Sequence, residues 1–174
     1  MLEILKGLLS LPTSLSGLIA GRSSLKADVQ TRNDIRYYMR SGIRKVETVL
    51  RSASDEQKVE AEKEYQSFKL PENEPGRSKK FVVRGKVPAN NAAKLFQVTK
   101  DVDAILSINT VFLSKELRRK LTDLRTLLQT CEFDYEHSNG DFRFARCYRL
   151  KEKMRKIIKE AKVSSPVQKI ASKI

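Results

Sequence analysis

The stretch "SKELRRKLTDLRTLLQTCEFDYEHSNGDFRFARCYRLKEKMRKIIKEA", residues 114–161, decides the fold class. In its first half, apolar residues recur in steps of four and three, at Leu117, Leu121, Leu124, Leu128, Cys131 and Tyr135. In its second half, the same spacing joins Phe144, Cys147, Leu150, Met154, Ile157 and Ala161. This period is typical of helices that bury one stripe. Turn-forming residues around Asn139 separate the halves, so we expect an all-α protein with a long C-terminal antiparallel helix hairpin.

The hairpin places its two cysteines at matching positions. Cys131 and Cys147 are equidistant from Asn139, so their thiols are expected on facing turns of one seam. A disulfide between them would require an oxidising compartment. Two reduced, buried thiols are the favoured interpretation, because free cysteine is a common core residue.

Upstream, helical periodicity extends over most of the chain. Residues 24–52 carry an apolar stripe at Leu25, Val29, Met39, Ile43, Val46 and Leu50, with Ile35 and Val49 beside it. The sequence "SDEQ", residues 54–57, predicts a capping box that opens a short second helix. Pro88 suits the start of a further helix whose buried face holds Ala92, Leu95, Val98, Val102 and Ile105.

The chain therefore divides into three predicted parts. Residues 1–22 form an amphipathic N-terminal helix, residues 23–163 a bundle of about four helices, and residues 164–174 a basic tail. Three prolines and two glycines interrupt the bundle at about residues 69–88 and predict a loop or short β insertion there. A short strand in this insertion would need a partner from another strand or another subunit.

Composition favours a partner of negative charge. The 174 residues include 35 Lys and Arg against 21 Asp and Glu, which gives a formal net charge of +14. Such an excess attracts nucleic acids and anionic lipid headgroups. No run of eighteen apolar residues indicates a transmembrane span.

Catalytic signatures are weak in this sequence. It contains no phosphate-cradling glycine loop, and its one histidine, His137, falls in a polar, loop-like stretch where solvent exposure is the simplest expectation. Two cysteines and one histidine offer little material for a metal site. We therefore expect a protein that is not an enzyme and uses no cofactor, metal or small-molecule substrate.

The second arm of the hairpin is the main candidate for anion binding. Outside its apolar seam this arm is almost entirely cationic, and the candidate anion-binding residues are Arg143, Arg146, Arg149, Lys153, Arg155, Lys156 and Lys159. A helix of this kind can lie along a phosphate backbone or an anionic bilayer. No base-reading signature accompanies it, so nucleic-acid binding would lack sequence specificity. A merely solvated charged face is the competing interpretation.

The opening segment is the candidate membrane or partner contact. On a helical projection its apolar residues fill one broad sector, and the candidate contacts are Leu2, Ile4, Leu5, Leu8, Leu9, Leu15, Leu18 and Ile19. Small polar residues fill the opposite wedge, and Pro12 predicts a kink. A secretory signal is disfavoured because the segment begins with Glu3 and lacks a typical cleavage site. A leucine-rich face of this width serves equally well for packing in the bundle, for a protein partner or for a homo-oligomer.

Together these features predict a non-enzymatic, basic, helical interaction protein. The first hypothesis is an intracellular protein, peripheral on the cytoplasmic face of a membrane, in which the N-terminal helix inserts and the cationic hairpin holds headgroups. The alternative is a non-sequence-specific nucleic-acid-binding accessory subunit of a larger assembly.

Overall fold

The computed structural model describes residues 11–69, 82–108 and 113–162, and it describes the side chains of the first helix from Lys26 onward. The predicted all-α class is confirmed, with a small two-stranded sheet added. The elements of the described chain are α2 (Leu11–Leu50), α3 (Asp55–Ser67), β1 (Arg84–Lys86), α4 (Ala89–Ser107), α5 (Lys115–His137), β2 (Asp141–Arg143) and α6 (Ala145–Glu160).

Side-chain caps fix where two of these helices begin. The Ser54 hydroxyl accepts a hydrogen bond from the Gln57 N–H at 3.1 Å, and the Gln57 side chain accepts one from the Ser54 N–H at 2.9 Å. This is the predicted capping box. The Ser114 hydroxyl likewise accepts from the Leu117 N–H at 3.1 Å, which satisfies one of the free amides at the start of α5.

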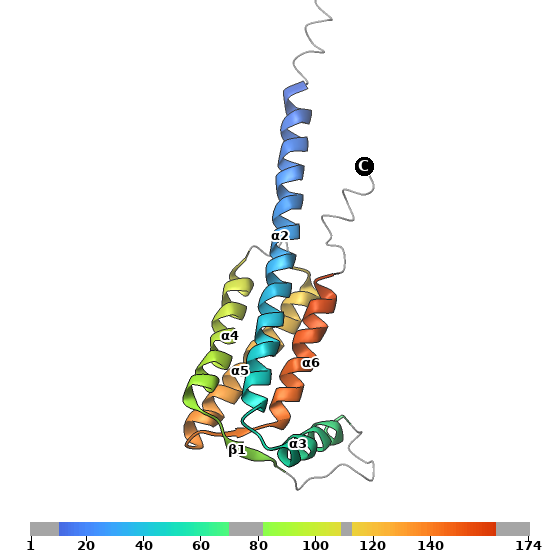
Figure 1. The fold of residues 1–174 in the computed structure, drawn as a ribbon. Coiled ribbons are helices and arrows are strands. Elements are labelled where there is room, and N and C mark those ends of the chain that lie inside the picture. The colour runs from blue at the N-terminus through green and yellow to red at the C-terminus, as the bar shows by residue number, and fades with distance from the viewer. Residues whose placement is uncertain (1–10, 70–81, 109–112, 163–174) are drawn as a thin grey trace, which may run out of the picture.

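Four helices lie side by side, and α3 crosses one end of them (Figure 1). Helix α2 packs against α4 and α6, and α5 packs against the same two helices. Because α2 and α5 share these neighbours without an extensive contact of their own, they occupy opposite corners of the bundle.

Helix α2 is much longer than its neighbours. It has 40 residues, which corresponds to about 60 Å of helix, and its first part projects beyond the ends of the other helices (Figure 1). The domain boundary expected at residue 22 falls inside this helix, which continues through it. Pro12 lies in the first turn of α2, where a missing N–H costs no hydrogen bond.

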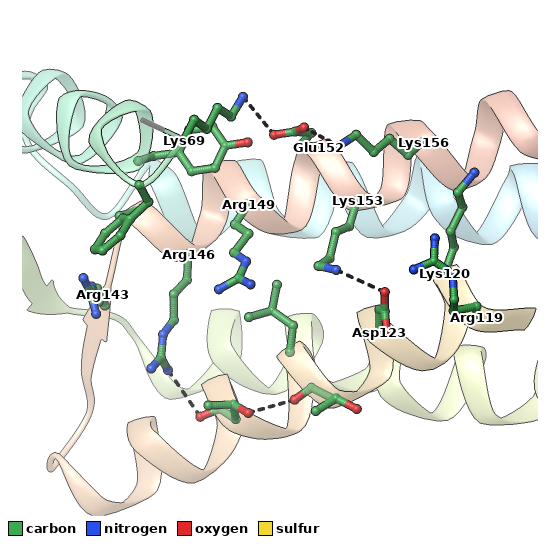
Figure 2. A pocket seen from close by; sticks show the side chains of 16 residues that line it. Lys69, Arg119, Lys120, Asp123, Arg143, Arg146, Arg149, Glu152, Lys153 and Lys156 are labelled. Atoms are coloured by element: carbon green, nitrogen blue, oxygen red, sulfur yellow. Dashed lines mark hydrogen bonds and ion pairs between the residues drawn. The ribbon is translucent and has the colours of Figure 1, made fainter. Parts of the chain in front are cut away.

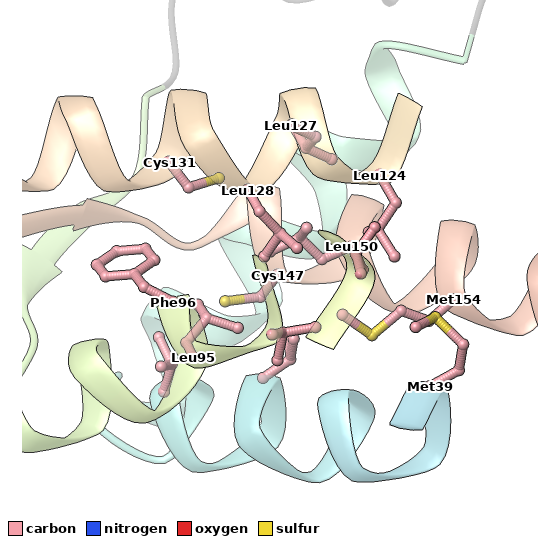
Figure 3. Packing of buried hydrophobic residues seen from close by; sticks show 14 of the residues in the cluster. Met39, Leu95, Phe96, Leu124, Leu127, Leu128, Cys131, Cys147, Leu150 and Met154 are labelled. Carbon is pink, nitrogen blue, oxygen red and sulfur yellow. The ribbon is translucent and has the colours of Figure 1, made fainter. Parts of the chain in front are cut away.

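The buried core follows the predicted stripes closely. Side chains from all four long helices meet in it (Figure 3), and the predicted positions that are nearly inaccessible are Ile35, Met39, Val46, Val49, Ala92, Leu95, Val98, Val102, Ile105, Leu117, Leu121, Leu124, Leu128, Cys131, Phe144, Cys147, Leu150, Met154 and Ile157. Burial of this apolar surface supplies most of the stabilisation.

One predicted core position was wrong. Val29 is 46 % exposed, although the sequence pattern placed it in the buried stripe of the first long helix. At 100° per residue, Val29 lies about 120° around α2 from the buried Ile35. The neighbouring Asp28 is the residue that turns inward there, and its carboxylate accepts from the Arg32 Nε at 3.2 Å.

The predicted β insertion contains β1, and its partner strand comes from the link between α5 and α6. The two strands are antiparallel, with Gly85 opposite Phe142. The chain reverses at Asn139 and Gly140, whose φ angles are 54° and 82°. The backbone then extends through β2, so Phe144, expected inside the second seam helix, instead precedes α6.

Candidate functional site

Helices α5 and α6, with β2 and the end of α3, enclose a groove of about 1170 Å³ (Figure 2). We call it the basic groove. Two of its lining residues, Asp123 and Glu152, are acidic, and its eight cationic lining residues are Lys69, Arg119, Lys120, Arg143, Arg146, Arg149, Lys153 and Lys156. The excess of positive charge in one concavity makes it the leading candidate for anion binding in the described chain.

Of the seven predicted anion-binding residues, the groove brings five together. Arg143, Arg146, Arg149, Lys153 and Lys156 line it. Arg155 and Lys159 are exposed but do not line it. The helical repeat explains why Arg155 is left out, because residues three and four apart share a side of α6 and Arg155 lies two positions from Lys153.

Sequence reasoning missed three cations of the groove, Lys69, Arg119 and Lys120. The last two lie near the start of α5, and the first follows α3. The positions of Arg119 and Lys120 could have been predicted from the helix hairpin. Antiparallel packing of α5 on α6 brings the start of α5 beside the end of α6. No comparable signal existed for Lys69, because its position depends on how α3 crosses the bundle.

Most groove cations have a carboxylate partner. Lys153 Nζ lies 3.8 Å from an Asp123 oxygen, and Arg146 pairs with Asp134. Glu152 accepts from two lysines, at 2.9 Å from Lys69 and 2.7 Å from Lys156. These pairs cross between helices or run along α6, and they orient the cationic side chains around the groove.

At one end of the groove, carboxylates of the protein neutralise the cationic side chains. Glu116 pairs with Arg119 at 2.8 Å and with Lys120 at 3.3 Å, and hydrogen bonds from these two side chains lower the pKa of Glu116 to about 2. Lys120 also binds Glu160 at 2.8 Å, and that hydrogen bond is the main reason that its pKa is raised. A ligand at this end would have to displace resident carboxylates.

Arg143 has a structural role. Its Nε donates to Glu64 Oε1 at 2.6 Å, and the Glu64 side chain is only 1 % exposed. The other oxygen of Glu64 accepts from the Val83 N–H at 3.0 Å. The guanidinium also lies 5.1 Å from the centre of the Phe68 ring. Arg143 therefore ties β2 to α3 and carries an aromatic ring at the groove edge.

Arg149 differs from every other cation of the groove. It is exposed, and among the described residues no carboxylate pairs with it. Figure 2 shows its guanidinium extending from α6 toward α5, between Arg146 and Lys153. The centre of the groove thus holds an uncompensated positive charge.

The N-terminal candidate contacts are only partly covered by the structure. Leu2, Ile4, Leu5, Leu8 and Leu9 lie outside the described residues. Leu15, Leu18 and Ile19 belong to the first turns of α2, and their side chains lie outside the described part of the structure.

The helical repeat relates these positions to the rest of α2. Counting 100° per residue from the buried Ile35, the buried stripe stays within about 60°, whereas the sequence position of Leu15 falls about 160° away and that of Leu18 about 100° away. Tyr37 and Arg44, both exposed, also fall about 160–180° from Ile35. The helical repeat therefore predicts Leu15 on the side of α2 that is turned away from the bundle and Leu18 at the margin of that side, although their side chains lie outside the described part of the structure.

This outward face of α2 is cationic where its side chains are described. Its exposed members in the described part are Lys26, Val29, Gln30, Asn33, Tyr37, Arg40 and Arg44. None of them is acidic, and Lys26, Arg40 and Arg44 pair with no carboxylate in the described chain. In its described part, the face thus combines unpaired cations with the exposed Tyr37 and Val29.

Other candidate chemical groups have simpler explanations. His137 is exposed at the end of α5, where its ring bonds to the Phe133 carbonyl at 2.7 Å and stacks on the Phe133 ring. Cys131 and Cys147 are free, buried thiols. Burial raises the pKa of Cys131 to about 11 and holds that of Cys147 well above the ordinary 9.0.

Two kinds of site are absent from residues 11–69, 82–108 and 113–162. No three His, Cys, Asp or Glu side chains gather to hold a metal ion there. No helix in that part of the chain is both long and apolar enough to cross a bilayer.

Comparisons with known proteins match no family model, no curated protein and no solved structure to this chain. Functional argument therefore rests on the two surfaces just described, the basic groove and the outward face of α2.

Proposed function

We propose that the protein is a non-enzymatic, peripheral membrane-binding protein that docks on the cytoplasmic face of an anionic bilayer through the outward face of α2. The proposal is carried by the unpaired cations and Tyr37 on the outward side of α2, together with the helical repeat, which predicts apolar positions at the start of the same helix on that side. That side faces away from α4 and α6, so the bundle does not obstruct contact with a flat surface.

The physical basis is that of an interfacial helix. Such a helix lies in the plane of the bilayer with its apolar side about 5–10 Å deep. Each Lys or Arg near an anionic surface adds about 1 kcal/mol of attraction. Lys26, Arg40 and Arg44 supply this term and pair with no carboxylate in the described chain, and Glu47 at the margin of this face is held by Lys151 at 3.0 Å. Tyr37, 68 % exposed, has the amphipathic ring that suits the headgroup region.

This assignment changes the role first expected for the cationic hairpin. The basic groove lies between α5 and α6, and α5 occupies the corner of the bundle opposite α2. A flat bilayer that lies along α2 does not reach the lining of that concavity. We therefore assign membrane contact to α2 and not to the groove.

Binding of the full-length chain to vesicles tests the proposal. Vesicles of phosphatidylserine and phosphatidylcholine should retain the wild-type protein on flotation, and vesicles of phosphatidylcholine alone should retain less. Replacing Arg40 and Arg44 with glutamine should weaken binding about 30-fold, since two charges of about 1 kcal/mol are lost. Replacing Leu15 and Leu18 with serine should abolish it.

The matched control is Arg149→Gln, which removes an equally exposed, unpaired cation from a different side of the bundle. It should leave vesicle binding unchanged. Undiminished binding by the leucine variant would refute the proposal. The proposal would also be refuted if the leucine variant lost self-association but kept vesicle binding. That result would show that the leucine positions contact another protein chain.

A further inference from the structure

We infer that the basic groove is a second binding site, independent of membrane docking, and that its ligand is a short segment of single-stranded nucleic acid. The inference stands on four features of the groove: its concavity, a row of cations along one wall, an uncompensated Arg149 at its centre and an exposed aromatic ring at its edge.

The row of cations suits an extended polyanion. Arg146, Arg149, Lys153 and Lys156 follow one side of α6 over ten residues, a rise of about 15 Å. Successive charges along this row have the linear arrangement of a phosphodiester backbone, and grooves that bind single strands track that backbone with positive charge. A compact single anion would engage only part of the row.

Arg149 provides the point of first contact. Its neighbours are held by acidic partners, with Arg146 on Asp134 and Lys153 within 3.8 Å of Asp123. Arg149 is exposed and has no such partner in the described chain, so a phosphate that binds it displaces no resident carboxylate. The pairs on either side are partly exposed, and of the two the 3.8 Å pair of Lys153 with Asp123 exchanges more readily for a phosphate contact.

Phe68 distinguishes nucleic acid from other anions. It follows α3, lines the groove and is 52 % exposed, so it is not buried with the core. The Arg143 guanidinium lies against this ring at 5.1 Å and is itself fixed by Glu64. A ring held in place beside a cationic row is the arrangement on which a base can stack, and such stacking is sequence-tolerant.

The shape of the groove argues against the competing anions. A bilayer is too flat to enter the concavity. An acidic peptide would match the charge but would leave Phe68 without a function. Because the groove and the outward face of α2 are on different sides of the bundle, either surface can bind when the other does not, and each proposal can fail alone.

The test measures fluorescence anisotropy of a labelled oligothymidylate of about ten nucleotides with the full-length protein. Arg149→Glu should weaken binding at least 30-fold, and Phe68→Ala should weaken it about 5- to 30-fold through loss of stacking. The matched control is Arg155→Glu, the same charge change on the same helix outside the groove, which should weaken binding less than about 3-fold through long-range attraction alone. With about three phosphates neutralised, the slope of log affinity against log salt should be near −2.

Three results would overturn the inference. The first is equal weakening by Arg155→Glu and Arg149→Glu, which would indicate only general attraction to a basic protein. The second is equally tight binding of polyglutamate of the same length, with no effect of Phe68→Ala, which would make the groove an acidic-peptide site. The third is no measurable binding of the oligonucleotide by the wild-type chain. Arg149→Gln provides a second variant with a smaller charge change, and circular dichroism verifies that every variant is folded.

Discussion

Arg143 and the buried Glu64 form a partly buried link between parts of the chain that are 79 residues apart, with the Arg143 Nε 2.6 Å from Glu64 Oε1. Because Glu64 also accepts from the Val83 N–H just before β1, one carboxylate holds α3 against both strands. The same link fixes the guanidinium that lies over Phe68 at the groove edge. Stability at this end of the bundle is thus coupled to the geometry of the proposed nucleic-acid site.

Removal of this link should destabilise the fold. Arg143→Met leaves the Glu64 carboxylate buried without its counter-charge, and we expect the free energy of unfolding to fall by roughly 3 kcal/mol. Urea denaturation followed by circular dichroism measures the change. Lys58→Met is the control, because Lys58 pairs with Asp55 on the surface and should contribute less than about 1 kcal/mol. Equal effects of the two variants would show that Glu64 does not depend on Arg143.

Local sequence pattern predicted the helices and their buried faces. The leucine seam of α5 and the stripe of α6 needed only the helical period, and the caps at Ser54 and Ser114 needed only short motifs. Val29 was misplaced because its spacing from Leu25 suggested one stripe, whereas packing selects the side of α2 centred near Ile35.

The basic groove and the outward face of α2 depend on how the helices pack, so the sequence predicted their residues only in part. Five groove cations followed from a charge run on one helix. The lack of a carboxylate partner for Arg149 in the described chain could not be predicted. It depends on which cations pair with carboxylates once α5 and α6 are packed together. The side of α2 that holds Leu15 and Leu18 could be related to the bundle only after the helix was seen to be continuous.

Gly85 of β1 should not tolerate even a methyl group. A Cβ atom there would lie 2.8 Å from the ring of Phe144, which is fully buried and has no room to move. We expect Gly85→Ala to destabilise the protein by about 1–3 kcal/mol through overpacking. Thermal unfolding of this variant compared with Gly42→Ala gives the measurement.

Gly42→Ala is the matched control for that change. A Cβ at Gly42 would meet the flexible end of Met154 at 3.0 Å, and alanine improves helix propensity by up to about 1 kcal/mol. Its net effect should therefore be smaller than that of Gly85→Ala. The reverse order would contradict the assignment of Phe144 as a rigid contact of β1.

The carboxyl group of Glu116 should titrate far below its ordinary value of 4.5. Hydrogen bonds from Arg119 and Lys120 lower its pKa to about 2, so the ionised form is favoured in the folded state. Its stabilising contribution is present above pH 4.5 and is lost as the pH falls toward 2. Carboxyl NMR titration should give a pKa near 2 in the wild type and a value closer to 4.5 in Arg119→Met. An ordinary pKa in the wild type would mean that these surface pairs do not persist in solution.

The two buried thiols predict an alkaline limit to stability and a slow reaction with thiol reagents. Burial raises the pKa of Cys131 to about 11 and holds that of Cys147 well above the ordinary 9.0, so the folded state holds these protons more tightly than the unfolded state does. The contribution of Cys131 to stability is therefore complete below pH 9 and is lost as the pH rises through about 11. At pH 8 the folded protein should react with iodoacetamide only as fast as it opens, and urea should accelerate the reaction in proportion to the unfolded fraction. Fast labelling of either cysteine without denaturant would show that the α5–α6 seam opens more readily than its burial indicates.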